Sequence, residues 1–261
     1  MRTTPRRLLT LAVALATTTG FMLAAGAGAQ AATPGSTTCS GGSIQAPATL
    51  PPGSYKNVQI AGFCGLDPSV AISGNVTVAP GAALQLSGAT IGGNLSVGSG
   101  AILFAYGAHV GGNVSASDAH ALYMFFSQVG KNLTLQGGGS GRNCTDPDPD
   151  TSFGNDTMVK DSHIAGNMTF SGWAGCWFGV LRNTVGGNMT IANMYANPLN
   201  INYPGTPDQT FQGLDSTEVG ANTVGGVLSC TGNTPAAQIG DSGAALNVAR
   251  KAVGECAALV G

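Results

Sequence analysis

The stretch Ile91-Gly92-Gly93-Asn94-Leu95-Ser96-Val97 determines the fold, because related copies of it recur along most of the chain. Each copy carries an asparagine, usually after glycine, followed by apolar and polar residues in alternation. The aligned asparagines are Asn57, Asn75, Asn94, Asn113, Asn132, Asn167 and Asn188. Their spacings are 18, 19, 19, 19, 35 and 21 residues, and a degenerate copy, Gly226-Val227-Leu228-Ser229-Cys230, follows. A period near 19 is typical of stacked repeats.

Each repeat has the pattern of several short β-strands. The residues one and three positions after the asparagine are apolar with a polar residue between them, which is typical of a strand with one buried face. A second alternating pair follows, such as Leu84 and Leu86 or Leu103 and Ala105, and the apolar residue before the glycines, such as Ile91, provides a third inward position. Three strands in about 19 residues predict one coil of an all-β, parallel β-helix, a solenoid.

The repeated asparagines are predicted to be structural. Stacked coils would place them above one another, where their amides can hydrogen-bond along the stack. We expect the neighbouring glycines to allow a positive φ in a sharp turn. Six of the asparagines lie in Asn-x-Ser/Thr sequons, but the polar position of the strand produces these automatically, which favours a structural role over glycosylation.

The chain begins with the features of a secretion signal. Arg2, Arg6 and Arg7 make a basic start, an apolar run follows, and Ala29-Gln30-Ala31 fits a cleavage site. We expect residues 1–31 to be a signal peptide, and the mature protein to be secreted, extracellular or at the cell surface, without a membrane span. Residues 32–52 are then an N-terminal cap, residues 53–235 the β-helix with insertions near 136–162 and 193–223, and residues 236–261 a C-terminal cap.

Six cysteines in an exported protein indicate disulfides. Six cysteines allow fifteen pairings. We favour nearest neighbours, since each pair would staple an end or an insertion of the repeat array: Cys39 with Cys64, Cys144 with Cys176, and Cys230 with Cys256. Zinc binding is the weaker alternative, because the sequence has no CxxC or HxxxH spacing.

The repeat and its ending, Gly225-Gly226-Val227-Leu228-Ser229-Cys230 and then Gly232-Asn233-Thr234-Pro235, resemble those of secreted bacterial right-handed parallel β-helix proteins of uncharacterised function. The resemblance covers most of the mature chain and implies a right-handed β-helix. More distantly, the coils look like those of bactofilins, which are polymer-forming β-helix proteins, although the export signal and the cysteines depart from that family. Neither resemblance supplies a catalytic motif.

The charge balance argues against nucleic acid as a partner. Of the ten Lys and Arg residues, three lie in the expected signal peptide, and the seven that remain are scattered and face twelve Asp and Glu. Phosphate binding needs a patterned set of cations, which this chain lacks.

Aromatic residues replace the usual small outward residues on neighbouring coils. Phe104 and Tyr106 occupy such positions on one coil, Tyr123 and Phe125 on the next, and Trp177 is expected to extend the column. An exposed aromatic column would suit sugar stacking or subunit contact. The alternative is that the first insertion, pinned by Cys144 and Cys176, covers the rings and forms a second small core.

The first insertion also carries clustered carboxylates. Asp146, Asp148 and Asp150 alternate with prolines there, and such a group could bind calcium or supply an acid and a base for polysaccharide cleavage. The prolines keep the run extended, and it lacks the glycine pattern of a calcium loop, so a solvated loop is the favoured interpretation. No cofactor is expected.

The leading hypothesis is therefore a secreted structural or adhesive surface β-solenoid without catalytic activity, able to self-associate through an end or the aromatic column. The alternative is a polysaccharide-binding module or a polysaccharide-degrading β-helix enzyme. The expected partners are cell-wall or extracellular polysaccharide, or the protein itself. An enzyme should have a groove lined by several carboxylates with Lys or Arg, whereas a contact protein should have only an apolar or aromatic face.

Overall fold

The computed structural model describes residues 36–139, 156–196, 217–240 and 245–261. The chain divides into residues 1–31 and residues 32–261, and every described residue belongs to the second unit. The expected signal peptide and the aspartates Asp146, Asp148 and Asp150 lie outside the described residues.

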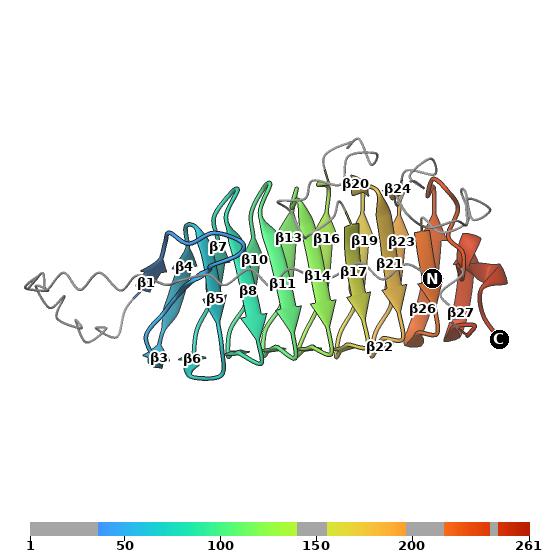
Figure 1. Cartoon of the computed structure of the whole chain (residues 1–261). Helices are drawn as coiled ribbons and strands as arrows, with labels where there is room; N and C mark the ends of the chain where they lie inside the picture. The colour runs from blue at the N-terminus through green and yellow to red at the C-terminus, as the bar shows by residue number, and fades with distance from the viewer. Residues whose placement is uncertain (1–35, 140–155, 197–216, 241–244) are drawn as a thin grey trace, which may run out of the picture. The chain divides into compact units, whose positions relative to one another are not determined.

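The described chain is a parallel β-helix, as predicted (Figure 1). A seventeen-stranded sheet contains two lines of strands, and all its printed pairs are parallel. The first line runs through β1 (Ser36–Cys39), β4 (Asn57–Ile60), β7 (Val76–Val78), β10 (Leu95–Val97), β13 (Val114–Ser117), β16 (Leu133–Gln136), β19 (Met168–Ser171), β23 (Met189–Ala192), β26 (Thr223–Thr231) and β27 (Val248–Gly254). The second line runs through β3 (Gly53–Tyr55), β6 (Val70–Ile72), β9 (Thr90–Ile91), β12 (His109–Val110), β15 (Gln128–Val129), β18 (His163–Ile164) and β22 (Thr184–Val185), and ends on β26.

An eight-stranded parallel sheet forms a further side of the coils. It runs through β2 (Ala48–Thr49), β5 (Phe63–Leu66), β8 (Ala83–Ser87), β11 (Ile102–Tyr106), β14 (Ala121–Phe125), β17 (Asp156–Lys160), β21 (Trp177–Leu181) and β25 (Thr217–Gly220). Two short strands, β20 (Ala174–Gly175) and β24 (Tyr195–Ala196), pair separately, and a 3₁₀ helix, η2 (Glu255–Ala258), lies near the C-terminus.

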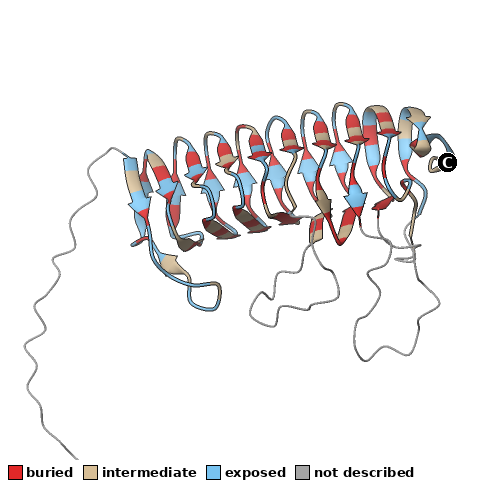
Figure 2. Cartoon of the chain, turned by 90° about the horizontal axis from the view of Figure 1, so that it is seen from above, coloured by how far each residue is buried: buried red, intermediate tan, exposed pale blue. Residues whose placement is uncertain are grey.

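The core lies inside the coils, and Figure 2 shows buried and exposed residues alternating along them. The inward positions predicted from the sequence are buried: Leu84 and Leu86 on β8 and Leu103 and Ala105 on β11 are at most 1% exposed. In-register pairing stacks each of these residues on its equivalent in the next coil, so that β8 Leu84 faces β11 Leu103. The apolar period of the sequence therefore sets the register.

The predicted asparagine ladder is confirmed. The side-chain Oδ1 of each asparagine accepts the backbone N–H of the asparagine in the next coil, at 2.8 to 3.2 Å, from Asn57 to Asn188. The Nδ2 of Asn94 also donates to the Oδ1 of Asn75, at 3.3 Å. The last oxygen, on Asn188, accepts the N–H of Val227 at 2.8 Å, and this bond needs only a backbone donor. The degenerate repeat can therefore lack its own asparagine.

The expectation that the glycines of this motif have positive φ was wrong. Gly93 and Gly112 are absent from the described positive-φ residues. A Cβ on Gly93 would instead lie 2.5 Å from both the Oδ1 of Asn75 and the carbonyl oxygen of Gly74. Glycine is favoured because the backbones of successive coils approach closely at this corner, although Lys131 occupies the equivalent position in one coil.

A second polar ladder, which the sequence did not predict, lies inside the protein. The Oδ1 of Asn183 accepts the N–H of Ser162 at 3.0 Å, and the Oδ1 of Asn222 accepts the N–H of Asn183 at 2.9 Å. Asn247 accepts the N–H of Asn222 in turn, at 3.0 Å. The same position is filled along the stack by Ala89, Ala108, Ser127, Ser162, Asn183, Asn222 and Asn247. All of them are at most 3% exposed.

Both ends contain more regular structure than the predicted caps. Within residues 32–52, β1 pairs with β4 and β2 pairs with β5 of the next coil. The β-helix therefore begins before residue 53. At the other end β27 adds a coil within residues 236–261, and only then does η2 follow. The predicted caps were too long because they were bounded by the glycine-asparagine motif. Ser36–Cys39 and Val248–Gly254 lack this motif but still form parallel pairs with the neighbouring coil.

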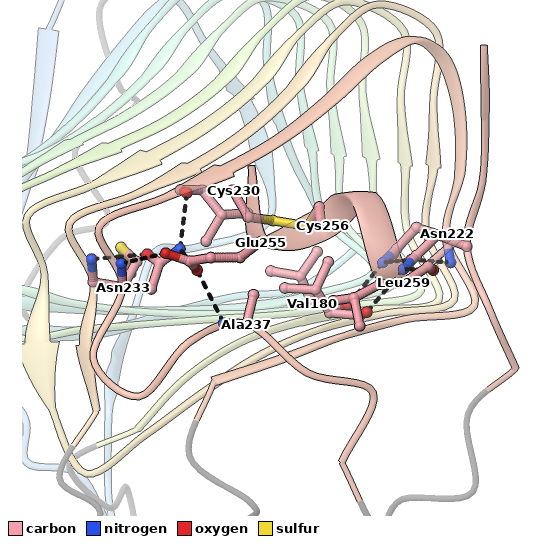
Figure 3. Close-up of a disulfide and its surroundings, with 12 residues drawn as sticks. Val180, Asn222, Cys230, Asn233, Ala237, Glu255, Cys256 and Leu259 are labelled. Carbon is pink, nitrogen blue, oxygen red and sulfur yellow. Dashed lines mark hydrogen bonds between the residues drawn. A yellow bond between two sulfur atoms is a disulfide. The ribbon is translucent and has the colours of Figure 1, made fainter. Parts of the chain in front are cut away.

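The predicted disulfides Cys39–Cys64 and Cys230–Cys256 are present. Cys176 is also disulfide-bonded, and Cys144, its predicted partner, lies outside the described residues. Beside the C-terminal bond, the carboxylate of Glu255 accepts hydrogen bonds from both the N–H and the Nδ2 of Asn233 and from the N–H of Ala237 (Figure 3). Burial of Glu255 raises its pKa, but these hydrogen bonds outweigh burial and hold the pKa below its usual range.

The predicted insertions were also drawn too widely. Asp156–Lys160, inside the expected insertion 136–162, forms β17, a regular strand of the eight-stranded sheet. Tyr195–Ala196 and Thr217–Gly220, inside the expected insertion 193–223, form β24 and β25. The coils thus continue on both sides of residues 140–155 and 197–216.

Candidate aromatic contact surface

The outer face of the eight-stranded sheet brings the predicted aromatic residues together. The register of β11 and β14 places Phe104 beside Tyr123 and Tyr106 beside Phe125. The ring centroids of Phe104 lie 6.1 Å from Tyr123 and 5.9 Å from Phe125. The aromatic column on two neighbouring coils is therefore confirmed.

Exposure differs from ring to ring within this column. Tyr106 is 53% exposed, Phe104 and Phe125 are half-buried, and Tyr123 is only 4% exposed. Exposure within the column thus ranges from an open ring to a buried one. The expected cover, residues 140–155 of the first insertion, lies outside the described residues.

A fifth aromatic residue, Phe126, was missed by the sequence analysis. Phe126 is 56% exposed, and its ring lies edge-to-face on that of Tyr106 with centroids 5.4 Å apart. We call Phe104, Tyr106, Phe125 and Phe126 the aromatic patch. The sequence does contain a pattern that marks Phe126. It stands 13 residues after Asn113, and the residues at the same distance after Asn75 and Asn94 are the corner glycines Gly88 and Gly107.

The backbone of Phe126 is strained. Its φ is +51°, a left-handed conformation in which the two preceding coils have glycine, with φ of +68° at Gly88 and +62° at Gly107. Such a conformation costs an L-residue about 1–2 kcal/mol, and it is rare for bulky side chains. Because the ring is more than half exposed, burial offsets little of this cost. A strained, exposed aromatic residue is a reason to look for function at this corner.

A groove opens next to the patch. It lies between the N-terminal loop and the outer face of β5, β8 and β11, and its lining is mostly apolar. The lining residues are Ser43, Ile44, Pro47, Phe63, Cys64, Ala83, Leu84, Gln85, Ile102 and Phe104. Phe104 belongs to both the groove and the aromatic patch, so the two form one continuous surface.

Trp177 does not extend the aromatic column. The register places Met158 and then Gly179 after Tyr123, whereas Trp177 pairs with Asp156. The ring of Trp177 lies across Gly179, where a Cβ would be 2.2 Å from its Cη2 atom, and the Nζ of Lys160 lies 4.6 Å from the ring centroid. Trp177 therefore packs against its own sheet and is separate from the patch.

Asp156 has the largest resolved pKa shift among the described residues. Burial raises its pKa to about 6, although a backbone hydrogen bond from Trp177 and the charge of Lys160 act in the opposite direction. A carboxyl group whose folded-state pKa is raised destabilises the folded protein once it ionises. Between the unfolded value, 3.8, and about 6, stability should fall as pH rises, and the loss should then stay constant.

We therefore expect Asp156→Asn to stabilise the protein at pH 7.5 by up to about 3 kcal/mol, since one pKa unit corresponds to about 1.4 kcal/mol. At pH 4 the substitution should have little effect. Denaturant unfolding at the two pH values measures this. Asp67→Asn is the control, because hydrogen bonds from Ser69 lower the pKa of Asp67 and that variant should gain nothing at pH 7.5. Equal effects of Asp156→Asn at both pH values would contradict the assignment.

Two further charged groups near this sheet form an ion pair at its corner. Arg182 donates to both carboxylate oxygens of Asp161 at 2.7 Å, and Asp161 and Arg182 follow Phe126 in the same left-handed corner column. His109 and His163 point outward in line with Thr184. Within the described ranges, no three His, Cys, Asp or Glu side chains are grouped as metal ligands would be.

In the part of the chain that the structure describes, no helix combines the length and the apolar character that a membrane crossing requires. No protein-family model, no curated protein and no solved structure matches this chain significantly.

Proposed function

We propose that this protein is a secreted structural or adhesive surface β-solenoid that acts by contact through its aromatic patch and not by catalysis. The observation that carries the proposal is the pair Tyr106 and Phe126, two adjacent rings that are each more than half exposed, one of them on strained backbone. Adjacent exposed rings form an apolar patch, and exposed apolar patches on proteins mark interaction surfaces.

The polar side chains nearest the patch support the proposal. Asp161 is paired with Arg182, and Asp156 is largely buried beside its strand partner Trp177, over whose ring the Nζ of Lys160 lies. The outward residues of β8, β11 and β14 include no Asp or Glu that could form an acid and base pair next to the rings. Cleavage of a glycosidic bond needs two such carboxyl groups.

A polysaccharide-binding module is the second candidate, and the groove beside Phe104 favours it. Aromatic and aliphatic walls with a few polar groups, here Ser43 and Gln85, are typical of small-ligand sites. In this case the partner would be cell-wall or extracellular polysaccharide.

Retention and cleavage assays with the mature chain, residues 32–261, test the proposal. We expect the protein to be retained on a cell-wall or polysaccharide-coated surface, or by immobilised copies of itself, without release of reducing sugars. Tyr106→Ser should reduce retention at least tenfold, whereas Tyr195→Ser, which alters an equally exposed ring on β24, should not. Sugar release that disappears on substitution of Asp148 and Asp150 would overturn the proposal in favour of an enzyme.

A further inference from the structure

The strands that hold the aromatic patch and the groove beside it carry no charge at their outward positions, and the nearest charge on this face, Lys160 of β17, lies beside Phe125 at its edge. These positions on β5, β8, β11 and β14 are filled by Phe63, Gly65, Ala83, Gln85, Ser87, Ile102, Phe104, Tyr106, Ala121, Tyr123 and Phe125. In a two-fold symmetric contact, one patch meets a copy of itself. A neutral face avoids the like-charge repulsion that such a contact otherwise creates.

The orientations of the rings favour a protein partner over a sugar. Phe104 is tilted by 42° from Tyr123 and by 52° from Phe125, and Tyr106 is tilted by 68° from Phe126. Rings tilted in this way offer no common plane for the flat faces of successive sugars, but they can interdigitate with other side chains. Depletion of charge and enrichment of aromatic residues are also typical of the buried centre of protein interfaces.

The C-terminal end of the solenoid is less suited to self-association. The last strand, β27, exposes Arg250 and Lys251 at its edge, and charged edge residues oppose strand addition. The C-terminal residues also fold back over this end, where Val260 forms a parallel bridge with Asn247. A contact through the sheet face meets neither obstacle.

We infer that the aromatic patch joins two copies of this chain face to face, with the Tyr106 and Phe126 rings of each copy packed against the patch of the other. The inference rests on the proposed function, since it names the partner of the same surface. The strain at Phe126 then has a compensation, because its ring becomes buried only in the dimer.

Phe126→Asn tests this inference without weakening the fold. Asparagine tolerates the left-handed conformation that strains phenylalanine, so the variant should unfold at the same urea concentration as the wild type or at a higher one. Sedimentation velocity and light scattering of residues 32–261 over a concentration series should give a dimer for the wild type. Phe126→Asn and Tyr106→Ser should each raise the dimer dissociation constant at least tenfold, and Tyr195→Ser should leave it unchanged.

The possible outcomes separate this inference from the proposed function. A wild-type protein that stays monomeric throughout the micromolar range overturns the dimer. If that monomer still binds polysaccharide and Phe126→Asn abolishes the binding, the contact function stands and the partner is a glycan. A dimer that both patch variants leave intact also overturns the inference, because the contact then lies elsewhere.

Discussion

Replacement of Asn222 by alanine should lower the free energy of unfolding by about 4 kcal/mol, because it leaves several buried polar groups without partners. The Oδ1 of Asn222 accepts the N–H and the Nδ2 of Asn183, and its Nδ2 donates to the carbonyl of Val180 at 2.8 Å and to Asn247 at 2.9 Å. Asn222 is fully buried, so water cannot replace these bonds in the folded state. Each orphaned group costs about 1–3 kcal/mol.

The matched control is Asn94→Ala in the outer ladder. Asn94 makes a similar set of bonds: its Oδ1 accepts the N–H and the Nδ2 of Asn113. Asn94 is exposed, however, so water can satisfy the groups that its side chain leaves, and we expect a loss of about 1 kcal/mol. Urea unfolding with the disulfides intact measures both variants. Equal losses would contradict the distinction between an inner and an outer ladder.

Replacement of Gly112 by alanine is the second change with a large expected effect. A Cβ there would lie 2.5 Å from the Oδ1 of Asn94 and 2.6 Å from the carbonyl oxygen of Gly93. Backbone atoms cannot move aside cheaply, so the coils must separate locally and the ladder bond between Asn94 and Asn113 must lengthen. In the next coil, where Lys131 carries a Cβ at this position, the ladder bond from Asn132 to Asn113 is the longest, at 3.2 Å. Overpacking of this kind costs about 1–3 kcal/mol and occasionally more, and we expect about 3 kcal/mol or more for Gly112→Ala, measured as the shift in urea midpoint.

Gly81→Ala distinguishes crowding from backbone conformation as the reason for glycine. Gly81 has φ of +71°, and a Cβ on it would meet no atom within 4 Å. Its substitution should cost about 1 kcal/mol, through backbone strain alone. If Gly81→Ala proved more harmful than Gly112→Ala, the close approach of the coils would not explain the motif.

The sequence predicted the solenoid because each coil repeats the same burial pattern. Leu84, Leu103 and Leu122 occupy one inward column and all three are buried, so their hydrophobicity marks the coil period directly. The roles of the motif glycines could not be assigned in the same way. Positive φ and close approach both select glycine, and only the position of the neighbouring coil separates the two causes.

The inner ladder was missed because its members change along the chain. Ala89 and Ala108 are followed at the same position by Ser127, Ser162 and then asparagines. Each of these residues stands two places before an inward apolar residue that recurs in every coil, as Ser127 precedes Val129 and Asn183 precedes Val185. Alignment on the apolar residue, in place of the outer asparagine, would have revealed the column.

The aromatic patch could be predicted only in part. Strand alternation placed Phe104, Tyr106, Tyr123 and Phe125 on one face, and that placement is confirmed. The exposure of each ring depends on what packs over it, which the alternation does not encode. Phe126 was missed because it lies at a corner and not on a strand. Trp177 was misplaced because it stands ten residues after Asn167, as Phe104 does after Asn94, but this coil is 21 residues long and its equivalent position is Gly179.

The disulfides at the two ends of the solenoid have a mechanical consequence. A stack of coils normally peels from its ends, where each terminal coil has a neighbour on one side only. Cys39–Cys64 and Cys230–Cys256 link residues 25 and 26 positions apart, so each bond closes about one terminal coil into a covalent ring. Tension applied at either terminus therefore bypasses the coil that would yield first and loads the interior, where every coil is held from both sides.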